Sequence, residues 1–354
     1  MIEPVNISEY GFDVLQIETK SICNMACQFC SYPIRADKGQ ELSKDVVYAL
    51  IDSLIADESL RHVCFSQFNE PLMDARIYDF ISYAKSKGVK VLLVTNALLF
   101  KSKEVIEKLV KAEPDFVRIS LHTLNDEMFK NARGTHCSFE DYRQWIYDYL
   151  KEAVSTNSKI TIDTACNFLS FRRSLKTGIF GLNRGDPSVY KSIDYLRNDL
   201  EEFLKGWQHV YNFFQFDKEE LSKFLKSLTI SYLEQDEFRM AENIFLKVKK
   251  FTYGRLLRDF YPVSVSAGCG SRELGVLASG NVVPCCLCYG DILKMGNVKE
   301  MSLDQILKQN KDLLKRIRSG NDFPPICSKC VGAPTRRGAI AQSIRNYLIK
   351  VLKK

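Results

Sequence analysis

The first half of the chain alternates between two hydrophobic patterns. Short, nearly continuous apolar runs predict β-strands that are covered on both faces, at residues 13–20, 61–67, 89–96, 115–123 and 159–168. Segments with apolar residues at helical spacing lie between these runs, at residues 43–56, 74–88, 101–112 and 138–154. Strands that alternate with helices predict βαβ units and a parallel sheet, so the fold class is α/β.

The pattern changes after residue 168. Residues 171–190 are rich in Gly and Arg and are expected to form a loop, and the chain to about Arg258 has the spacing of two or three amphipathic helices. We predict one last strand near 261–268 and divide the chain into four parts. These are an α/β unit (1–168), a helical insert that caps the substrate (169–260), a cysteine-bearing segment with the last strand (261–338) and a basic amphipathic helix (339–354).

Composition places the chain among ordinary globular proteins. Hydrophobic residues make up 45% and charged residues 26% of its 354 residues, and no apolar run reaches the ~20 residues of a membrane span. The polar N-terminus does not resemble a secretory signal, so we expect a cytoplasmic protein. The net charge of +7 is interleaved along the chain, and nucleic acid is not an expected partner.

Twelve cysteines without an export signal indicate metal or redox chemistry rather than a disulfide scaffold. Cys64, Cys137 and Cys166 stand alone, and packing in the core is the simplest interpretation for them. The other nine fall into two groups: Cys23, Cys27 and Cys30, and then Cys269, Cys285, Cys286, Cys288, Cys327 and Cys330.

The first group has the spacing C-x3-C-x2-C and follows the first predicted strand directly. Three thiolates so close together can hold three irons of a [4Fe–4S] cluster and leave the fourth iron open. Zinc is the alternative, but structural zinc sites use four ligands, and the nearest further candidates are His62 and Cys64.

With Phe29 in the last gap, this motif resembles the C-x3-C-x-aromatic-C signature of the radical S-adenosylmethionine (SAM) superfamily. The resemblance implies a partial (β/α)6 barrel of the TIM type. It also implies that the open iron chelates the amino and carboxylate groups of SAM. An electron then cleaves SAM to methionine and a 5′-deoxyadenosyl radical.

Further matches follow the ends of successive predicted strands, where ligands of parallel sheets gather. An N-E-P turn partly matches the G-G-E-P turn of the family, in which the Glu holds the methionine amino group. Later segments resemble the T-N-G, I-S-L-D and A-R-G segments of the family, and the Arg of the last pairs with the SAM carboxylate. Taken singly, each residue is explained as well by a cap, a turn or a surface charge. The residues implied in SAM binding are Phe29, Asn69, Glu70, Pro71, Asn96, Ser120 and Arg133.

The second cysteine group combines a C-x10-G-x4-C segment, which includes a hairpin-like turn at Gly280, with a C-x2-C pair. By spacing alone, zinc and an iron–sulfur cluster are equally good interpretations. The layout resembles the SPASM/twitch region of radical SAM enzymes. That resemblance implies one auxiliary [4Fe–4S] cluster with four ligands: Cys269, Cys285, Cys327 and Cys330.

Cys286 and Cys288 are left over from this ligand set. Either can replace Cys285 as a ligand or pack as a small apolar residue, which is the simpler interpretation. As tentative catalytic residues, they would donate a hydrogen atom to a substrate radical, as in peptide epimerases with a similar pair.

The resemblance predicts a radical SAM oxidoreductase that a reducing flavodoxin or ferredoxin supplies with electrons. About twenty residues precede the first motif, which leaves no room for an N-terminal peptide-recognition domain and favours a small substrate of sugar or aminocyclitol type. The alternatives are a peptide-modifying maturase or epimerase, and an iron–sulfur or zinc sensor without catalysis.

The C-terminal segment carries apolar residues at helical spacing, from Ile340 to Leu352, among basic residues. We expect this helix to pack its apolar face on the barrel. The alternative is that a basic helix meets an acidic partner or a membrane surface.

Overall fold

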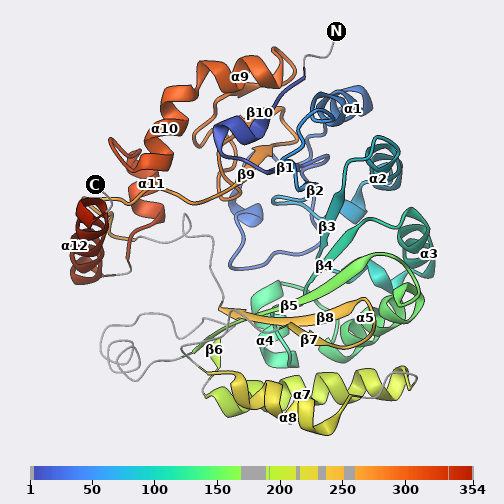
Figure 1. Cartoon of the computed structure of the whole chain (residues 1–354). Coiled ribbons are helices and arrows are strands. Elements are labelled where there is room, and N and C mark those ends of the chain that lie inside the picture. Colours follow the sequence, from blue (N-terminus) through green and yellow to red (C-terminus); the bar gives the residue numbers. More distant parts are fainter. Residues whose placement is uncertain are drawn as a thin grey trace.

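The computed structural model describes residues 4–168, 189–190, 192–212, 216–229, 237–250, 260–333 and 335–352. An eleven-stranded sheet forms its centre (Figure 1). The strands are β1 (Val14–Ile17), β2 (His62–Phe65), β3 (Val91–Thr95), β4 (Phe116–Ser120), β5 (Lys159–Phe168), β6 (Val189–Tyr190), β7 (Glu237–Arg239), β8 (Ile244–Lys250), β9 (Glu273–Val276), β10 (Asn281–Val283) and β11 (Gly296–Asn297).

The sheet is an open, partial barrel. Its order is β11-β10-β9-β1-β2-β3-β4-β5-β8-β7, and β6 pairs with β5 beside this path. Neighbouring strands from β9 through β1–β5 to β8 are parallel, whereas β10, β11 and β7 are antiparallel to their neighbours. The parallel array confirms the predicted α/β fold class.

Helices cover the outer side of this sheet. In Figure 1, α1, α2, α3 and α5 lie along the outside of the strands that they connect, and α7 and α8 lie beyond β7. The helices are α1 (Lys44–Ser53), α2 (Ile77–Ser86), α3 (Lys103–Ala112), α4 (Asp126–Arg133), α5 (Phe139–Ala153), α7 (Ile193–Val210), α8 (Lys218–Ser227), α9 (Leu303–Gln309), α10 (Lys311–Ser319), α11 (Pro325–Cys330) and α12 (Arg336–Leu352). Short 3-10 turns are η1 (Ile7–Tyr10), η2 (Tyr32–Ile34), η3 (Pro71–Met73) and η4 (Leu98–Lys101).

Alternation along the strands divides the core into two parts. Side chains such as Val63 and Phe65 belong to the large cluster that includes the helices. Cys64 lies between them, and it forms a separate small cluster with its register partner Leu92 and with Val14. A strand turns successive side chains to opposite faces, so this second cluster lies on the inner side of the barrel. Cys64 packs in the core there, as expected.

The last barrel strand was predicted in the wrong place. Residues 261–268 form no strand, and β8 pairs in parallel with β5 instead. Pro262 has no N–H to give to a ladder, and neighbouring backbone groups bond to helices, for example Val263 N–H to the Ser328 carbonyl. In β8, buried Ile244, Leu246 and Val248 alternate with other residues, which is the period of a strand.

The described part of the insert is therefore mixed, since α7 and α8 precede the β7–β8 hairpin. The predicted loop at 171–190 lies almost wholly outside the described residues, and Cys166 is described in its backbone only. The proposed division of the chain into four parts stays a prediction.

Helix α12 forms as predicted but packs with the other face. The apolar residues that were expected to pack on the barrel are exposed, including Ile344 and Leu348. The helix docks through a polar face, in which Ser343 is buried and accepts a hydrogen bond from Ser264 N–H at 3.0 Å. Among the helices that the structure describes, none has the length and apolarity to cross a bilayer.

Candidate active site

The first cysteine group lies in the loop that follows β1. Cys27 is buried, and Cys23 and Cys30 are half-buried. The Asn96 amide donates to the Cys23 sulfur at 3.6 Å, and Tyr32 N–H donates to the Cys30 sulfur at 3.4 Å. Burial raises the pKa of the Cys23 thiol to about 12 and that of Cys30 to about 11. Bound metal would displace these protons, because thiolates are the ligands of iron–sulfur clusters.

The C-terminal end of α4 packs on this cysteine loop. Gln28 N–H donates to the Ala132 carbonyl at 3.0 Å. Gly134, which caps α4, has φ +60°, and a Cβ there would lie 2.7 Å from the Ala26 carbonyl oxygen. Only glycine fits this approach. The sequence pattern did not lead us to predict α4, although its Asn125 cap is a recognisable start signal.

Glu70 joins the ends of β2 and β3 beneath the cysteine loop. It is 1% exposed, and one carboxylate oxygen accepts from Thr95 Oγ1 at 2.8 Å and Leu72 N–H at 3.2 Å. The other oxygen accepts from Asn96 N–H at 2.6 Å. Burial outweighs these bonds and raises the pKa of Glu70 to about 7. Because Asn96 contacts Cys23, Glu70 fixes a residue that touches the cysteine group.

Arg133 is a buried cation with unused donors. It is 1% exposed, and its Nε and Nη2 have no hydrogen-bond partner among the described residues. Its Cζ lies 6.0 Å from the centre of the Phe29 ring in the cysteine motif. An unpaired buried guanidinium is costly, and its fork of N–H donors matches a carboxylate. The chain thus offers a fitting partner for the carboxylate of SAM.

The other implied residues lie at the same edge of the sheet. Asn69 accepts from Gln67 N–H at 3.0 Å, and its buried Nδ2 has no partner among the described residues. Pro71 begins η3 directly after Glu70, and Ser120 is the last residue of β4. The structure therefore brings Glu70, Asn96 and Cys23 together, and Arg133 with Phe29. It places Asn69, Pro71 and Ser120 at neighbouring strand ends.

Tyr142 and Ala97 also belong to this site and were not predicted. Tyr142, buried on α5, donates its hydroxyl to the Asn96 carbonyl at 2.7 Å. Ala97 follows Asn96 in the left-handed conformation, with φ 62°, at the place where the family's T-N-G has glycine. The T-N-A match could have indicated Ala97, whereas Tyr142 resembles the other aromatic residues on its helix.

The second cysteine group surrounds a cavity of about 30 Å³. Cys285 and Cys288 reach it from the segment after β10, Cys327 and Cys330 from α11, and Cys269 from the segment before β9. The remaining lining is apolar: Pro284, Leu287, Leu293, Ile317, Phe323, Ile326 and Val331. A pocket of thiols and apolar groups fits an iron–sulfur cluster.

All four predicted auxiliary ligands line this cavity, with Cys288 as a fifth thiol. Hydrogen bonds from the Cys286 and Cys288 thiols lower the pKa of the Cys285 thiol. Cys286 is not among the lining residues. In the described part of the chain, no three His, Cys, Asp or Glu side chains are close enough to hold a single metal ion.

The two cysteine regions are joined by direct contacts. Gln67, two residues before Asn69, donates its amide to the Cys288 carbonyl at 2.9 Å. Glu18, which follows β1, accepts from Ala278 N–H at 3.1 Å near the turn between β9 and β10. The same carboxylate forms a buried ion pair with Arg35 in the loop after the first cysteine motif.

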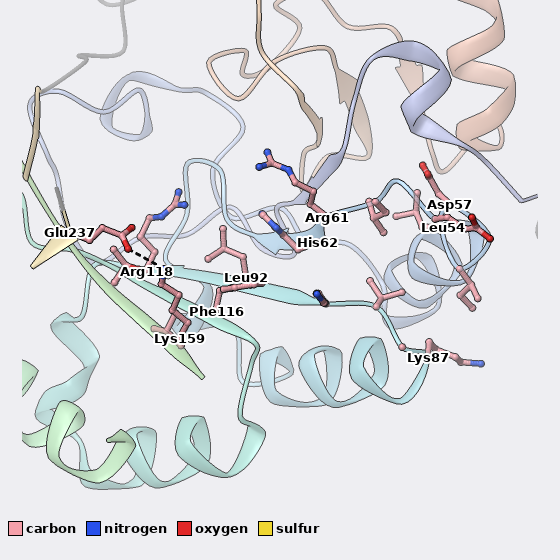
Figure 2. A pocket seen from close by; sticks show the side chains of 18 residues that line it. Leu54, Asp57, Arg61, His62, Lys87, Leu92, Phe116, Arg118, Lys159 and Glu237 are labelled. Carbon is pink, nitrogen blue, oxygen red and sulfur yellow. Dashed lines mark hydrogen bonds and ion pairs between the residues drawn. The ribbon is translucent and has the colours of Figure 1, made fainter. Parts of the chain in front are cut away.

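A larger cavity of about 640 Å³ opens at the other end of the strands (Figure 2). Residues at the beginnings of strands line it, including His62, Phe116 and Lys159. Its charged residues are largely paired, as Lys159 is with Glu237 at 3.0 Å. It contains none of the predicted SAM or cluster residues, so its size does not make it the active site.

Comparison with known families gives two matches. Residues 17–164 match the radical SAM superfamily, and residues 268–331 match SPASM, an iron–sulfur cluster-binding domain. The AdoMet-dependent heme synthase of Methanosarcina barkeri is 23% identical over 324 residues, which cover 87% of this chain and 85% of that protein. The SPASM match favours iron–sulfur over zinc at the second cysteine group.

Solved structures share the fold at low identity. BtrN in complex with AdoMet and 2-DOIA matches with a TM-score of 0.52 and 13% identity, over 92% of this chain and 96% of BtrN. SuiB of Streptococcus suis bound to its precursor peptide SuiA matches with a TM-score of 0.51 and 14% identity. That match covers 88% of this chain and 69% of SuiB.

Proposed function

Because this chain belongs to the radical SAM superfamily and carries a SPASM iron–sulfur domain, we propose that it oxidises a small molecule of sugar or aminocyclitol type. The observation that carries the proposal of SAM cleavage is the buried, partly unpaired guanidinium of Arg133 beside the cysteine motif. When bound, SAM and its cluster would supply a 5′-deoxyadenosyl radical that takes a hydrogen atom from a carbinol carbon; the substrate radical would then lose its hydroxyl proton to solvent and one electron to the auxiliary cluster, which leaves the carbonyl.

The chain's own residues bind and orient these groups. Cys23, Cys27 and Cys30 hold the first cluster, and Arg133 binds the SAM carboxylate. The role of Glu70 is to hold the turn at Asn96 in place, because its carboxylate already accepts three hydrogen bonds from this part of the chain. Phe29, Asn69, Pro71, Asn96 and Ser120 complete the proposed SAM site.

The second site holds the auxiliary cluster in an apolar pocket. The proposed ligands are Cys269, Cys285, Cys327 and Cys330, with Cys288 as the fifth lining thiol. The apolar walls keep water from the sulfur atoms. A reduced flavodoxin or ferredoxin is the proposed electron donor.

Structures that share the fold were solved with a small molecule and with a peptide. This chain aligns with 96% of BtrN, which binds 2-DOIA, but with only 69% of SuiB, which binds a peptide.

The test is a reaction with an aminocyclitol or sugar deuterated at a carbinol carbon, run anaerobically with SAM and dithionite. We expect deuterium in 5′-deoxyadenosine and a carbonyl product in equal amount. Formation of 5′-deoxyadenosine without deuterium from any such compound would contradict the substrate class and leave SAM cleavage intact.

The position of Cys286 favours a second candidate, a peptide epimerase. Cys286 does not line the auxiliary cavity, so it is not needed there as a ligand, and in this candidate function it donates a hydrogen atom. Cys288, which lines the cavity, fits this role less well. A peptide product formed in D₂O would then carry one deuterium at the epimerised carbon. Cys286→Ala should abolish this product while iron content and 5′-deoxyadenosine formation persist.

A further inference from the structure

Helix α12 exposes an apolar face to solvent. Of the ten large apolar side chains that are exposed in the described residues, six lie on this helix: Ile340, Ile344, Tyr347, Leu348, Val351 and Leu352. Their spacing of three and four residues places them on one face. Single exposed apolar residues are ordinary on a protein surface, but a contiguous stripe marks an interaction site.

Although its apolar face is exposed, α12 is attached to the rest of the fold. On the other face, Ser343 is buried and bonded to Ser264 N–H, and the Asn346 amide donates to the Val265 carbonyl at 2.9 Å. The Gln342 amide donates to the Val331 carbonyl at 2.7 Å. The docked face thus consists of small and polar side chains, among them buried Ala339, while the large apolar side chains lie on the exposed face.

The C-terminal segment after Asp322 carries only positively charged side chains. No Asp or Glu follows Asp322 in the sequence, while seven basic residues do: Lys329, Arg336, Arg337, Arg345, Lys350, Lys353 and Lys354. Arg336, Arg337 and Arg345 are exposed on the same helix as the apolar stripe. In Figure 1, α12 lies at the edge of the molecule beside α11.

We propose that α12 binds the surface of an anionic lipid membrane and lies in its plane. The apolar stripe would enter the boundary between head groups and acyl chains, and the arginines would contact lipid phosphates. A second copy of the chain is a poorer occupant, because two helices without acidic residues repel each other. The apolar stripe contains none of the cysteines or proposed SAM-binding residues, so the proposal does not depend on the proposed function.

The test is sedimentation of the reconstituted full-length protein with vesicles. One set of vesicles contains phosphatidylcholine alone, and the other contains phosphatidylcholine with phosphatidylglycerol. We expect binding to the second set that weakens as salt is added, since the attraction to anionic lipid is screened. Equal binding to both sets, or to neither, would overturn the proposal.

Variants separate the apolar and the charged contributions. The pair Ile344→Gln and Leu348→Gln should lower the partition coefficient about tenfold or more, because two apolar side chains no longer enter the lipid. Arg337→Gln with Arg345→Gln should lower it by a similar factor, about tenfold or more, on anionic vesicles only. Ile55→Gln is the matched apolar control, since Ile55 is exposed on another part of the surface, and Lys103→Gln with Lys111→Gln is the charge control.

All these side chains are exposed, so circular dichroism and iron content should match the parent protein. The controls should bind vesicles as the parent does. If the helix variants bind like the parent, the proposal is wrong. If the parent ignores vesicles and forms dimers that the apolar variants cannot form, a second copy covers the stripe instead.

Discussion

The buried guanidinium of Arg133 lowers the stability of the folded protein, and it offers donors to a carboxylate ligand. Its guanidinium is buried with Nε and Nη2 unpaired among the described residues, and a carboxylate ligand would satisfy both. Replacing a buried, poorly paired charge by an apolar side chain is often neutral or stabilising. The same replacement removes the proposed partner of the SAM carboxylate.

Arg133→Met should therefore leave the free energy of unfolding unchanged or raise it by about 1–3 kcal/mol. It should weaken SAM binding at least about tenfold. Thermal unfolding and anaerobic equilibrium dialysis of SAM measure the two effects. Arg133→Lys is the control that keeps the charge but loses the fork of donors. Unchanged SAM affinity in the Met variant would show that Arg133 has another role.

His62 makes stability depend on pH in a defined direction. Its side chain lies in the larger cavity (Figure 2), and burial, with Arg61 and Arg118 nearby, lowers its pKa to about 4. Asp13 and Asp115 oppose this shift only in part. Between pH 6.5 and 4 the unfolded chain binds a proton here that the folded chain does not, so the contribution of His62 to stability is lost as the pH falls.

His62→Gln should flatten the fall in melting temperature between about pH 6.5 and 4, in comparison with the parent protein. His136→Gln, which changes an exposed histidine, is the control. If parent and His62→Gln lose stability in parallel over this range, the buried imidazole is not the cause.

At the scale of elements, strands with strong patterns were predicted well. The runs that became β1 to β5 are apolar because helices cover one face and the barrel interior the other. The β7–β8 hairpin was missed, because the whole region up to Arg258 was interpreted as amphipathic helices. The alternation of Ile244, Leu246 and Val248 with Phe245, Lys247 and Lys249 is the period of a strand, but it extends over only a few residues. Helix α4 was missed because it is short and was interpreted only as the carrier of Arg133.

The contact between α4 and the cysteine loop gives an element-scale prediction. Gly134→Ala should displace the loop, because the new Cβ would lie 2.7 Å from the Ala26 carbonyl oxygen and the residue has positive φ. We expect a loss of stability of at least about 2 kcal/mol and poor iron loading of the first cluster.

Gly39→Ala is the matched control for this change. Gly39 also has positive φ, but a Cβ at this position would meet no atom within 4 Å, so only backbone strain of about 1 kcal/mol is expected. Denaturant titration and iron content measure both variants. Equal effects in the two would show that the contact with Ala26 does not hold the cysteine loop.

At the scale of the whole molecule, the proposed site residues rest on motifs in the sequence, whereas the packing around them does not. Both cysteine groups, Glu70 and Arg133 came from motifs, because their spacing along the chain is itself the requirement. Other features depend on contacts between elements that are far apart in sequence. These are the unpaired donors of Arg133, the hydrogen bond from Tyr142 to Asn96 and the fifth thiol of the auxiliary cavity, Cys288. The outward apolar face of α12 could not be predicted, since periodicity shows a face but not what it meets.

Iron content tests the assignment of the two cysteine groups. With two [4Fe–4S] clusters the parent should hold about eight irons per chain, and Cys327→Ala should hold about four. Cys286→Ala should stay near eight, because Cys286 does not line the auxiliary cavity. A loss of about four irons in Cys286→Ala would instead make Cys286 a ligand.

The most direct test of radical SAM chemistry is the formation of 5′-deoxyadenosine. The reconstituted protein is mixed anaerobically with SAM and dithionite, and the products are separated by chromatography. We expect 5′-deoxyadenosine and methionine from the parent protein and none from Cys27→Ala. A parent protein that binds iron but forms no 5′-deoxyadenosine would contradict the account and indicate an iron–sulfur protein without this catalysis.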